Sequence, residues 1–137
     1  MSLRLAEPLS DRDAGMLNAL QLAYLGDSVW ETVVRDTLVH RGLNVHHMHR
    51  FCVEYVNAAA QASFLDRILP ETDEHEQEII RRGRNAHARH PAPRNQEPGD
   101  YSAATGFEAL IGYLYITGNE ERILYFAGMI IGGNGDG

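Results

Sequence analysis

The sequence contains no lysine and only one cysteine, Cys52. A single cysteine excludes a disulfide framework and a cysteine-rich zinc site. No apolar run reaches the roughly 18 residues that a membrane-spanning helix needs, so an integral membrane protein is excluded. The first residues carry acidic side chains and no apolar signal core, which argues against secretion. We therefore expect a protein of the reducing cytoplasm.

What is present has the proportions of a globular domain. The chain has 137 residues, of which 44% are hydrophobic and 23% are charged. This length favours one domain that buries enough surface for a core. We expect residues 1–131 to form that domain and the glycine-rich residues 132–137 to be a disordered tail.

Charge is distributed unevenly along the chain. There are 12 basic residues, all arginine, against 19 acidic residues, and the formal net charge is −7. Residues 81–96, which we call the arginine segment, contain five of the arginines and no acid. Guanidinium groups suit phosphate because they present forked donors. We interpret the segment as nucleic-acid binding; the alternative is a set of basic side chains that offset a helix dipole, followed by a solvated loop.

Apolar residues recur at helical spacing along almost the whole chain. A loop is expected at residues 88–100, where prolines and a glycine interrupt the pattern. No β-type alternation stands out, so we predict an all-α bundle. Ser10 and Asp11 form a predicted N-terminal cap region, after which an apolar stripe over residues 22–38 predicts a helix that stops at Gly42. The other predicted helices cover residues 44–69, residues from a cap at Thr72 to about 84, residues 102–117 and residues 120–131.

Two acidic residues lie among small residues in apolar helices. Asp27 directly follows Gly26, where another backbone can approach closely. Glu108 has Ala104, Thr105 and Gly112 as its helical neighbours, and these also permit close packing. Two carboxylates from packed helices could hold a hard divalent cation, which prefers oxygen ligands, water and phosphate. Solvated surface charges remain the alternative.

A histidine cluster is a weaker candidate for a metal site. His46 and His49 share one face of a predicted helix, a spacing that is compatible with zinc binding. No acid lies at a suitable spacing beside them, which favours solvated histidines. Cys52 lies on an apolar helix face and is expected to be buried and inert.

Three ordered motifs resemble the ribonuclease III family. Residues 22–31, Leu-Ala-Tyr-Leu-Gly-Asp-Ser-Val-Trp-Glu, are similar to the signature helix of ribonuclease III catalytic domains. Residues 107–115, Phe-Glu-Ala-Leu-Ile-Gly-Tyr-Leu-Tyr, are similar to their second acidic helix. Residues 82–86 and 93–95, Arg-Gly-Arg-Asn-Ala and Pro-Arg-Asn, resemble the small Mini-ribonuclease III branch, which is a catalytic domain without a double-stranded-RNA-binding domain.

The resemblance implies an all-α endonuclease fold, a homodimer and cleavage of double-stranded RNA. It also implies dependence on Mg²⁺, with Mn²⁺ as a substitute, and maturation of the 23S ribosomal RNA precursor. On this basis Asp27 and Glu108 are the catalytic, metal-binding carboxylates. The larger enzymes carry acids where this chain has Leu20, Ala23 and Thr105. Because Glu31 lies one turn after Asp27, it is a candidate supporting carboxylate.

Without a separate RNA-binding domain, the catalytic domain itself must grip the duplex. The arginine segment supplies the expected contacts to phosphate and sugar. Two other functions remain open: a non-catalytic helical dimer that binds RNA or assists ribosome assembly, and a helical protein–protein adaptor. The predicted RNA-binding residues are Arg81, Arg82, Arg84, Asn85, Arg89, Arg94 and Asn95.

Overall fold

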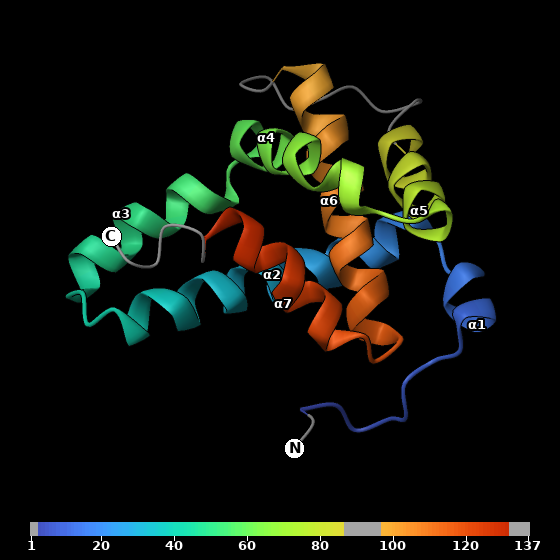
Figure 1. Cartoon of the computed structure of the whole chain (residues 1–137), viewed down its shortest axis with the longest axis horizontal. Helices are drawn as coiled ribbons and strands as arrows, with labels where there is room; N and C mark the ends of the chain where they lie inside the picture. Colours follow the sequence, from blue (N-terminus) through green and yellow to red (C-terminus); the bar gives the residue numbers. More distant parts are fainter. Residues whose placement is uncertain (1–2, 87–96, 132–137) are drawn as a thin grey trace.

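The computed structural model describes residues 3–86 and 97–131 (Figure 1). Every regular element in these residues is a helix, which confirms the predicted all-α class. None of the described helices is long and apolar enough to cross a membrane. The elements are α1 (Asp11–Gly15), α2 (Ala19–His40), α3 (Val45–Val56), α4 (Ala58–Ile68), the short 3₁₀ helix η1 (Leu69–Glu71), α5 (Glu74–Asn85), α6 (Pro98–Ile116) and α7 (Glu120–Ile130).

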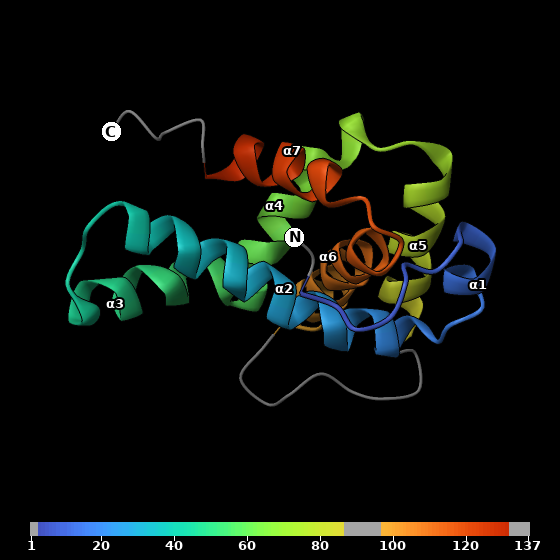
Figure 2. The ribbon, with the colours of Figure 1, turned by 90° about the horizontal axis from the view of Figure 1, so that it is seen from below.

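Helix α6 is the centre of the bundle. Figure 2 looks nearly along its axis and shows α2, α4, α5 and α7 around it. Its middle residues are buried on all sides, from Ala103 to Leu114 with the exception of Glu108. A helix that is apolar all round is expected in a core rather than at a surface. The one charged residue in this stretch therefore stands out from its surroundings.

Three aromatic side chains from different helices form the core beside α6. Trp30 of α2 meets Phe107 of α6 edge to face at 5.0 Å between ring centroids, and Phe64 of α4 lies 6.1 Å from Trp30. The buried indole Nε1 donates to the backbone oxygen of Tyr55 at 2.8 Å, so burial leaves no unpaired donor there. This cluster fixes α2, α4 and α6 against one another.

The single helix predicted over residues 44–69 is wrong, because Asn57 divides it into α3 and α4. Asn57 has an extended backbone, and its side-chain oxygen accepts a hydrogen bond from Ala60 N at 2.8 Å. Asparagine favours this N-cap position because its side chain satisfies a free amide of the first turn. The run of alanines after it concealed the break in the sequence pattern.

Two predicted helix starts also differ from the structure. Helix α5 is capped by Asp73 and not by Thr72, since Asp73 and Glu76 form a capping box. Helix α6 begins at Pro98, four residues before the predicted start, with the proline in its first turn. Proline suits this position because its missing amide hydrogen would be unpaired anyway. The rest of the predicted loop at 88–96 and the predicted tail at 132–137 lie outside the described residues.

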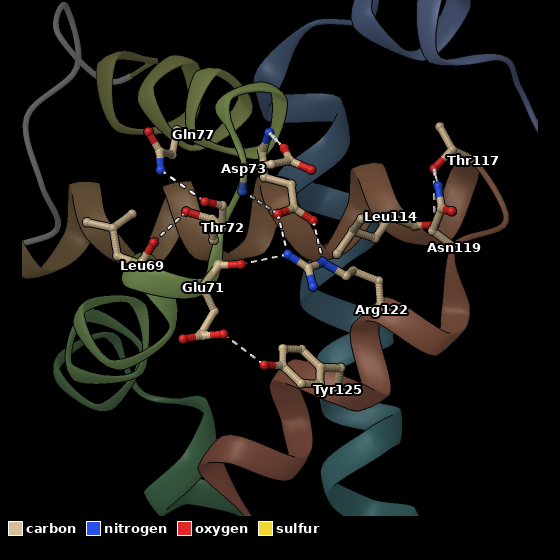
Figure 3. A network of polar contacts seen from close by, with 11 residues as sticks. Leu69, Glu71, Thr72, Asp73, Gln77, Leu114, Thr117, Asn119, Arg122 and Tyr125 are labelled. Atoms are coloured by element: carbon tan, nitrogen blue, oxygen red, sulfur yellow. Dashed lines mark hydrogen bonds and ion pairs between the residues drawn. The ribbon is translucent and has the colours of Figure 1, made fainter.

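A buried ion pair ties α7 to the start of α5 (Figure 3). Glu76 is 4% exposed, and Arg122 donates to both of its carboxylate oxygens at 2.8 and 2.9 Å. Arg122 also donates to the backbone oxygen of Glu71 at 2.7 Å. The pKa of the Arg122 guanidinium is raised, chiefly by its hydrogen bonds to Glu76. The pair is compensated within the chain and leaves no charge free for chemistry.

Candidate active site

Helices α2 and α6 cross in backbone contact. A Cβ atom at Gly26 would overlap the backbone oxygen of Glu108 and lie 2.7 Å from Gly112 N. A Cβ atom at Gly112 would in turn overlap the backbone oxygen of Leu22. Only glycine fits at either position, which confirms that the small residues around the two acids permit close packing. The crossing brings Asp27, the residue after Gly26, to the side of Glu108.

Burial and Asp27 both act on the carboxyl group of Glu108. Burial is the largest cause that raises the pKa of Glu108 to about 8, and the charge of Asp27 and a hydrogen bond with Asp27 act in the same direction. Asp27 itself is exposed on α2. Glu108 is therefore mostly protonated at neutral pH when no cation is bound. A cation bound beside these carboxyl groups would favour the ionised form of Glu108, because an opposite charge nearby lowers the pKa of a carboxyl group.

Gln61 of α4 completes the site on its third side. The side chain is 1% exposed, and its amide acts on Glu108 in the opposite direction to Asp27, lowering the pKa of the carboxyl. Within the described residues Nε2 makes no hydrogen bond of normal geometry. Gln61 was not predicted from the sequence. A signal was present, because Gln61 is the one polar residue on the α4 face that also carries Phe64, Leu65 and Ile68.

The donor set suits a hard divalent cation. The chain offers the oxygen atoms of two carboxylates, and Mg²⁺ commonly takes only one or two carboxylates and completes its shell with water and phosphate. The described residues contain no cluster of three or more histidine, cysteine, aspartate or glutamate side chains that could hold a metal. Ala23 and Thr105, which stand where the larger enzymes carry acids, are both buried and add no carboxylate. The residues present therefore fit an ion shared with substrate.

Glu31 lies one turn after Asp27 on α2 but is paired within the helix. Its carboxylate forms an ion pair with Arg35, four residues further on. A contribution to a metal site would require Glu31 to leave this pair. The structure thus places Glu31 near Asp27 in the chain without bringing it into the group formed by Asp27, Glu108 and Gln61.

The first arginines of the arginine segment are engaged within the chain. Arg82 is half-buried, and its guanidinium donates to the backbone oxygens of Gly15 at 3.0 Å and Leu17 at 2.5 Å. These bonds hold the end of α5 to the link between α1 and α2. Arg81 is exposed and pairs with Glu78 at 2.5 Å, one turn earlier in α5. Offsetting the helix dipole is therefore not the only role of the arginines at the end of α5, because Arg82 also holds this helix to the α1–α2 link.

Arg84 and Asn85 are exposed and make no ion pair or side-chain hydrogen bond within the described part of the chain. Their helix lies against α6, since a Cβ atom at Gly83 would approach the Cα of Gly106 to 2.7 Å. The last turn of α5 therefore meets α6 two residues before Glu108. Three other predicted RNA contacts lie outside the described residues: Arg89, Arg94 and Asn95.

The remaining candidates from the sequence do not form sites. His46, His47 and His49 are exposed at the start of α3. In the part of the chain that the structure describes, they belong to no group of three or more metal-binding side chains. Cys52 is 7% exposed and has the buried environment that its apolar helix face predicts.

The comparisons with known proteins agree with this geometry. The model of the Ribonuclease III domain matches residues 20–119, a range that includes Asp27, Gln61 and Glu108. This chain belongs to the ribonuclease III family. Among its relatives, the Mini-ribonuclease 3 of Symbiobacterium thermophilum is 48% identical over 122 residues, which cover 88% of each chain. The Mini-ribonuclease 3 of Desulfitobacterium hafniense is 47% identical over 80% of this chain and 69% of the relative.

A solved structure shares the fold of this chain. A crystal structure of a protein from Fusobacterium nucleatum has a TM-score of 0.79 to this chain at 30% sequence identity. The match covers 89% of this chain and 98% of that protein. The named relatives and the family model confirm the resemblance to Mini-ribonuclease III drawn from the three motifs, and the family model together with the solved structure confirms the predicted ribonuclease III-type fold.

Proposed function

We propose that this ribonuclease III family member is a divalent-metal-dependent endoribonuclease that acts on double-stranded RNA in the cytoplasm, with the 23S ribosomal RNA precursor as its substrate. Membership of the family gives the reaction class, which is hydrolysis of phosphodiester bonds within an RNA chain. The observation that carries the proposal is the meeting of Asp27 and Glu108 at the glycine crossing of α2 and α6. The dependence on a divalent cation and the ribosomal substrate are proposed in addition to this reaction class.

Asp27 and Glu108 are the residues that would hold Mg²⁺, or Mn²⁺ in its place. When bound, such an ion lowers the pKa of a water molecule, orients the scissile phosphate and offsets its developing charge. Glu108 must release its proton to become a ligand, because a metal competes with protons for a carboxylate. Neither carboxylate acts as the nucleophile. Glu31 is retained as a supporting carboxylate only if Glu31→Gln weakens metal binding.

The grip on RNA is assigned to the arginine segment. Arg84 and Asn85 are exposed and free to contact a duplex, and Arg89, Arg94 and Asn95 are proposed to extend this surface. Arg81 and Arg82 would join them only by leaving their partners in α5 and at the α1–α2 link. Phosphate contacts carry no base information, so binding should follow duplex shape and fall steeply with salt.

We also propose a homodimer formed through α2. The exposed side of this helix carries Tyr24, which is 85% exposed. Next to it lies a mostly apolar hollow between α2 and α7, with Leu25, Val29, Val33 and Leu124 in its lining. Exposed aromatic and aliphatic groups of this kind commonly mark an association surface. A two-fold axis here would provide one carboxylate site for each RNA strand.

The test compares wild-type protein with Asp27→Asn and Glu108→Gln on a long duplex RNA and on a 23S precursor transcript. Cleavage should require Mg²⁺ or Mn²⁺ and stop with a chelator. Each substitution should lower the rate by at least about 100-fold, since changes even outside the metal's ligands cost about 10- to 100-fold. Asp36→Asn is the matched control, because Asp36 is an exposed acid of the same helix and the variant should cleave normally.

The competing function is a non-catalytic RNA-binding dimer, which the missing acids at Ala23 and Thr105 favour. It would bind both RNAs without cutting either, with or without metal. Loss of folding in Asp27→Asn or Glu108→Gln, seen by circular dichroism, would instead assign the acids a structural role.

A further inference from the structure

Gln61 combines burial with an unused hydrogen-bond donor. It lies on the side of α4 that faces the core, and only 1% of its surface is exposed. Its Nε2 has no hydrogen-bond partner among the described residues, and Gln61 contributes the only buried side-chain nitrogen or oxygen atom there in that condition. A buried donor without a partner is unfavourable for the fold. An apolar residue at position 61 would therefore serve the fold better, and the amide needs another explanation.

The surroundings of Gln61 point to Glu108. Phe64, one turn later on α4, lies 6.3 Å from Phe107 between ring centroids, so this part of α4 faces the same turn of α6 that carries Glu108. The Gln61 amide also favours the ionised form of the Glu108 carboxyl, as a nearby donor does. Asp27 approaches Glu108 from α2, on the other side.

We propose that Gln61 is a positioning residue whose Nε2 donates a hydrogen bond to the ionised Glu108 carboxylate when that carboxylate binds a divalent cation. The bond satisfies one oxygen of Glu108 and fixes its rotamer, which leaves the other oxygen to face the ion. In the cation-free structure Nε2 of Gln61 is buried and makes no hydrogen bond of normal geometry within the described residues. This inference rests on the proposed function, because it assigns Glu108 as a metal ligand.

An amide is the side chain that suits this role. A lysine or arginine would donate a hydrogen bond but would also repel the cation. A third acid would accept rather than donate, and would add repulsion between carboxylates before the ion arrives. Glutamine donates without adding charge. Residues that orient metal ligands through hydrogen bonds in this way typically affect metal affinity by about 10- to 100-fold.

The decisive measurement is made on the wild-type protein by NMR of glutamine side-chain amides during a titration with Mg²⁺ alone. The Gln61 Nε2 protons should move downfield and exchange more slowly with solvent as the site fills. Gln77 is an internal control, because its Nε2 already donates to Thr72 O at 3.1 Å (Figure 3). Signals of Gln61 that stay fixed while backbone amides around Asp27 respond to Mg²⁺ would overturn this inference and leave the metal site standing. If no signal responds, both proposals fail.

A substitution provides the second test. Gln61→Met keeps the volume and removes the donor, so it should weaken binding of Mn²⁺ to the RNA-free protein about tenfold. The melting temperature should stay the same or rise, because an unpaired buried group is lost. KM for duplex RNA at saturating metal should not change. A folded Gln61→Met protein with wild-type affinity for Mn²⁺ would reduce Gln61 to a packing residue.

Discussion

At the scale of single residues, the position of Glu108 that suits cation binding is unfavourable for the stability of the cation-free fold. Glu108 is placed where burial and Asp27 both oppose its charge, which raises its pKa from 4.5 to about 8. In the cation-free protein it therefore keeps a proton that the unfolded chain has already released above pH 4.5. Folded protein binds more protons than unfolded protein in this window, so this residue makes stability decrease as the pH rises towards 8.

This conflict predicts that Glu108→Gln stabilises the cation-free fold. Glutamine cannot ionise, so the difference in the free energy of unfolding between variant and wild type should be smallest near pH 5. It should grow to on the order of 3 kcal/mol near pH 8. Urea titrations in a chelator at pH 5, 6.5 and 8 measure it directly. A difference that does not change with pH would mean that Glu108 is ionised in the folded protein throughout.

At the scale of helices, the site depends on how closely α2 and α6 approach. Gly26→Ala should destabilise the fold by about 3–5 kcal/mol, because the added methyl group would overlap the backbone of Glu108 and must push the helices apart. Gly128→Ala is the matched control. Gly128 is an exposed glycine of α7 with no atom within 4 Å of the place that a Cβ atom would take, and alanine there should stabilise the helix by about 1 kcal/mol. Thermal unfolding of both variants tests this, and equal effects would remove the crossing as the cause.

Local sequence patterns account for most of the helices and for their crossing. Helical periodicity and small residues around Asp27 and Glu108 predicted the bundle and the close approach of its two central helices. The break at Asn57 and the early start of α6 at Pro98 were missed, since a cap or a first-turn proline is read only once the neighbouring segments are placed. Gln61 was missed for a different reason. Gln61 stood out as a polar residue on the apolar face of α4, but its partner Glu108 lies 47 positions away in the chain, and no local pattern reveals that pairing.

At the scale of the whole molecule, an acidic protein must approach a polyanion. The formal charge is −7, yet the arginine segment contains no acid. Among the described arginines of that segment, two bind partners within the chain and one is exposed without such a partner among the described residues. Arg82 binds the backbone of the α1–α2 link and Arg81 binds Glu78, whereas Arg84 is exposed at the end of α5. Charge counting alone would have treated these three side chains as equivalent.

This division predicts opposite consequences for two neighbouring substitutions. Arg84→Ala should keep the stability of the wild type but weaken duplex RNA binding and reduce the slope of log affinity against log salt by about 1 for each subunit that contacts the duplex. Arg82→Ala should lower the free energy of unfolding by about 1–3 kcal/mol, because two backbone oxygens lose their donor. Binding is measured in the Asp27→Asn background, so that cleavage does not interfere. If Arg82→Ala changed the salt slope and Arg84→Ala did not, Arg82 would have to exchange its backbone partners for phosphate in the complex, and the RNA surface would begin two residues earlier on α5.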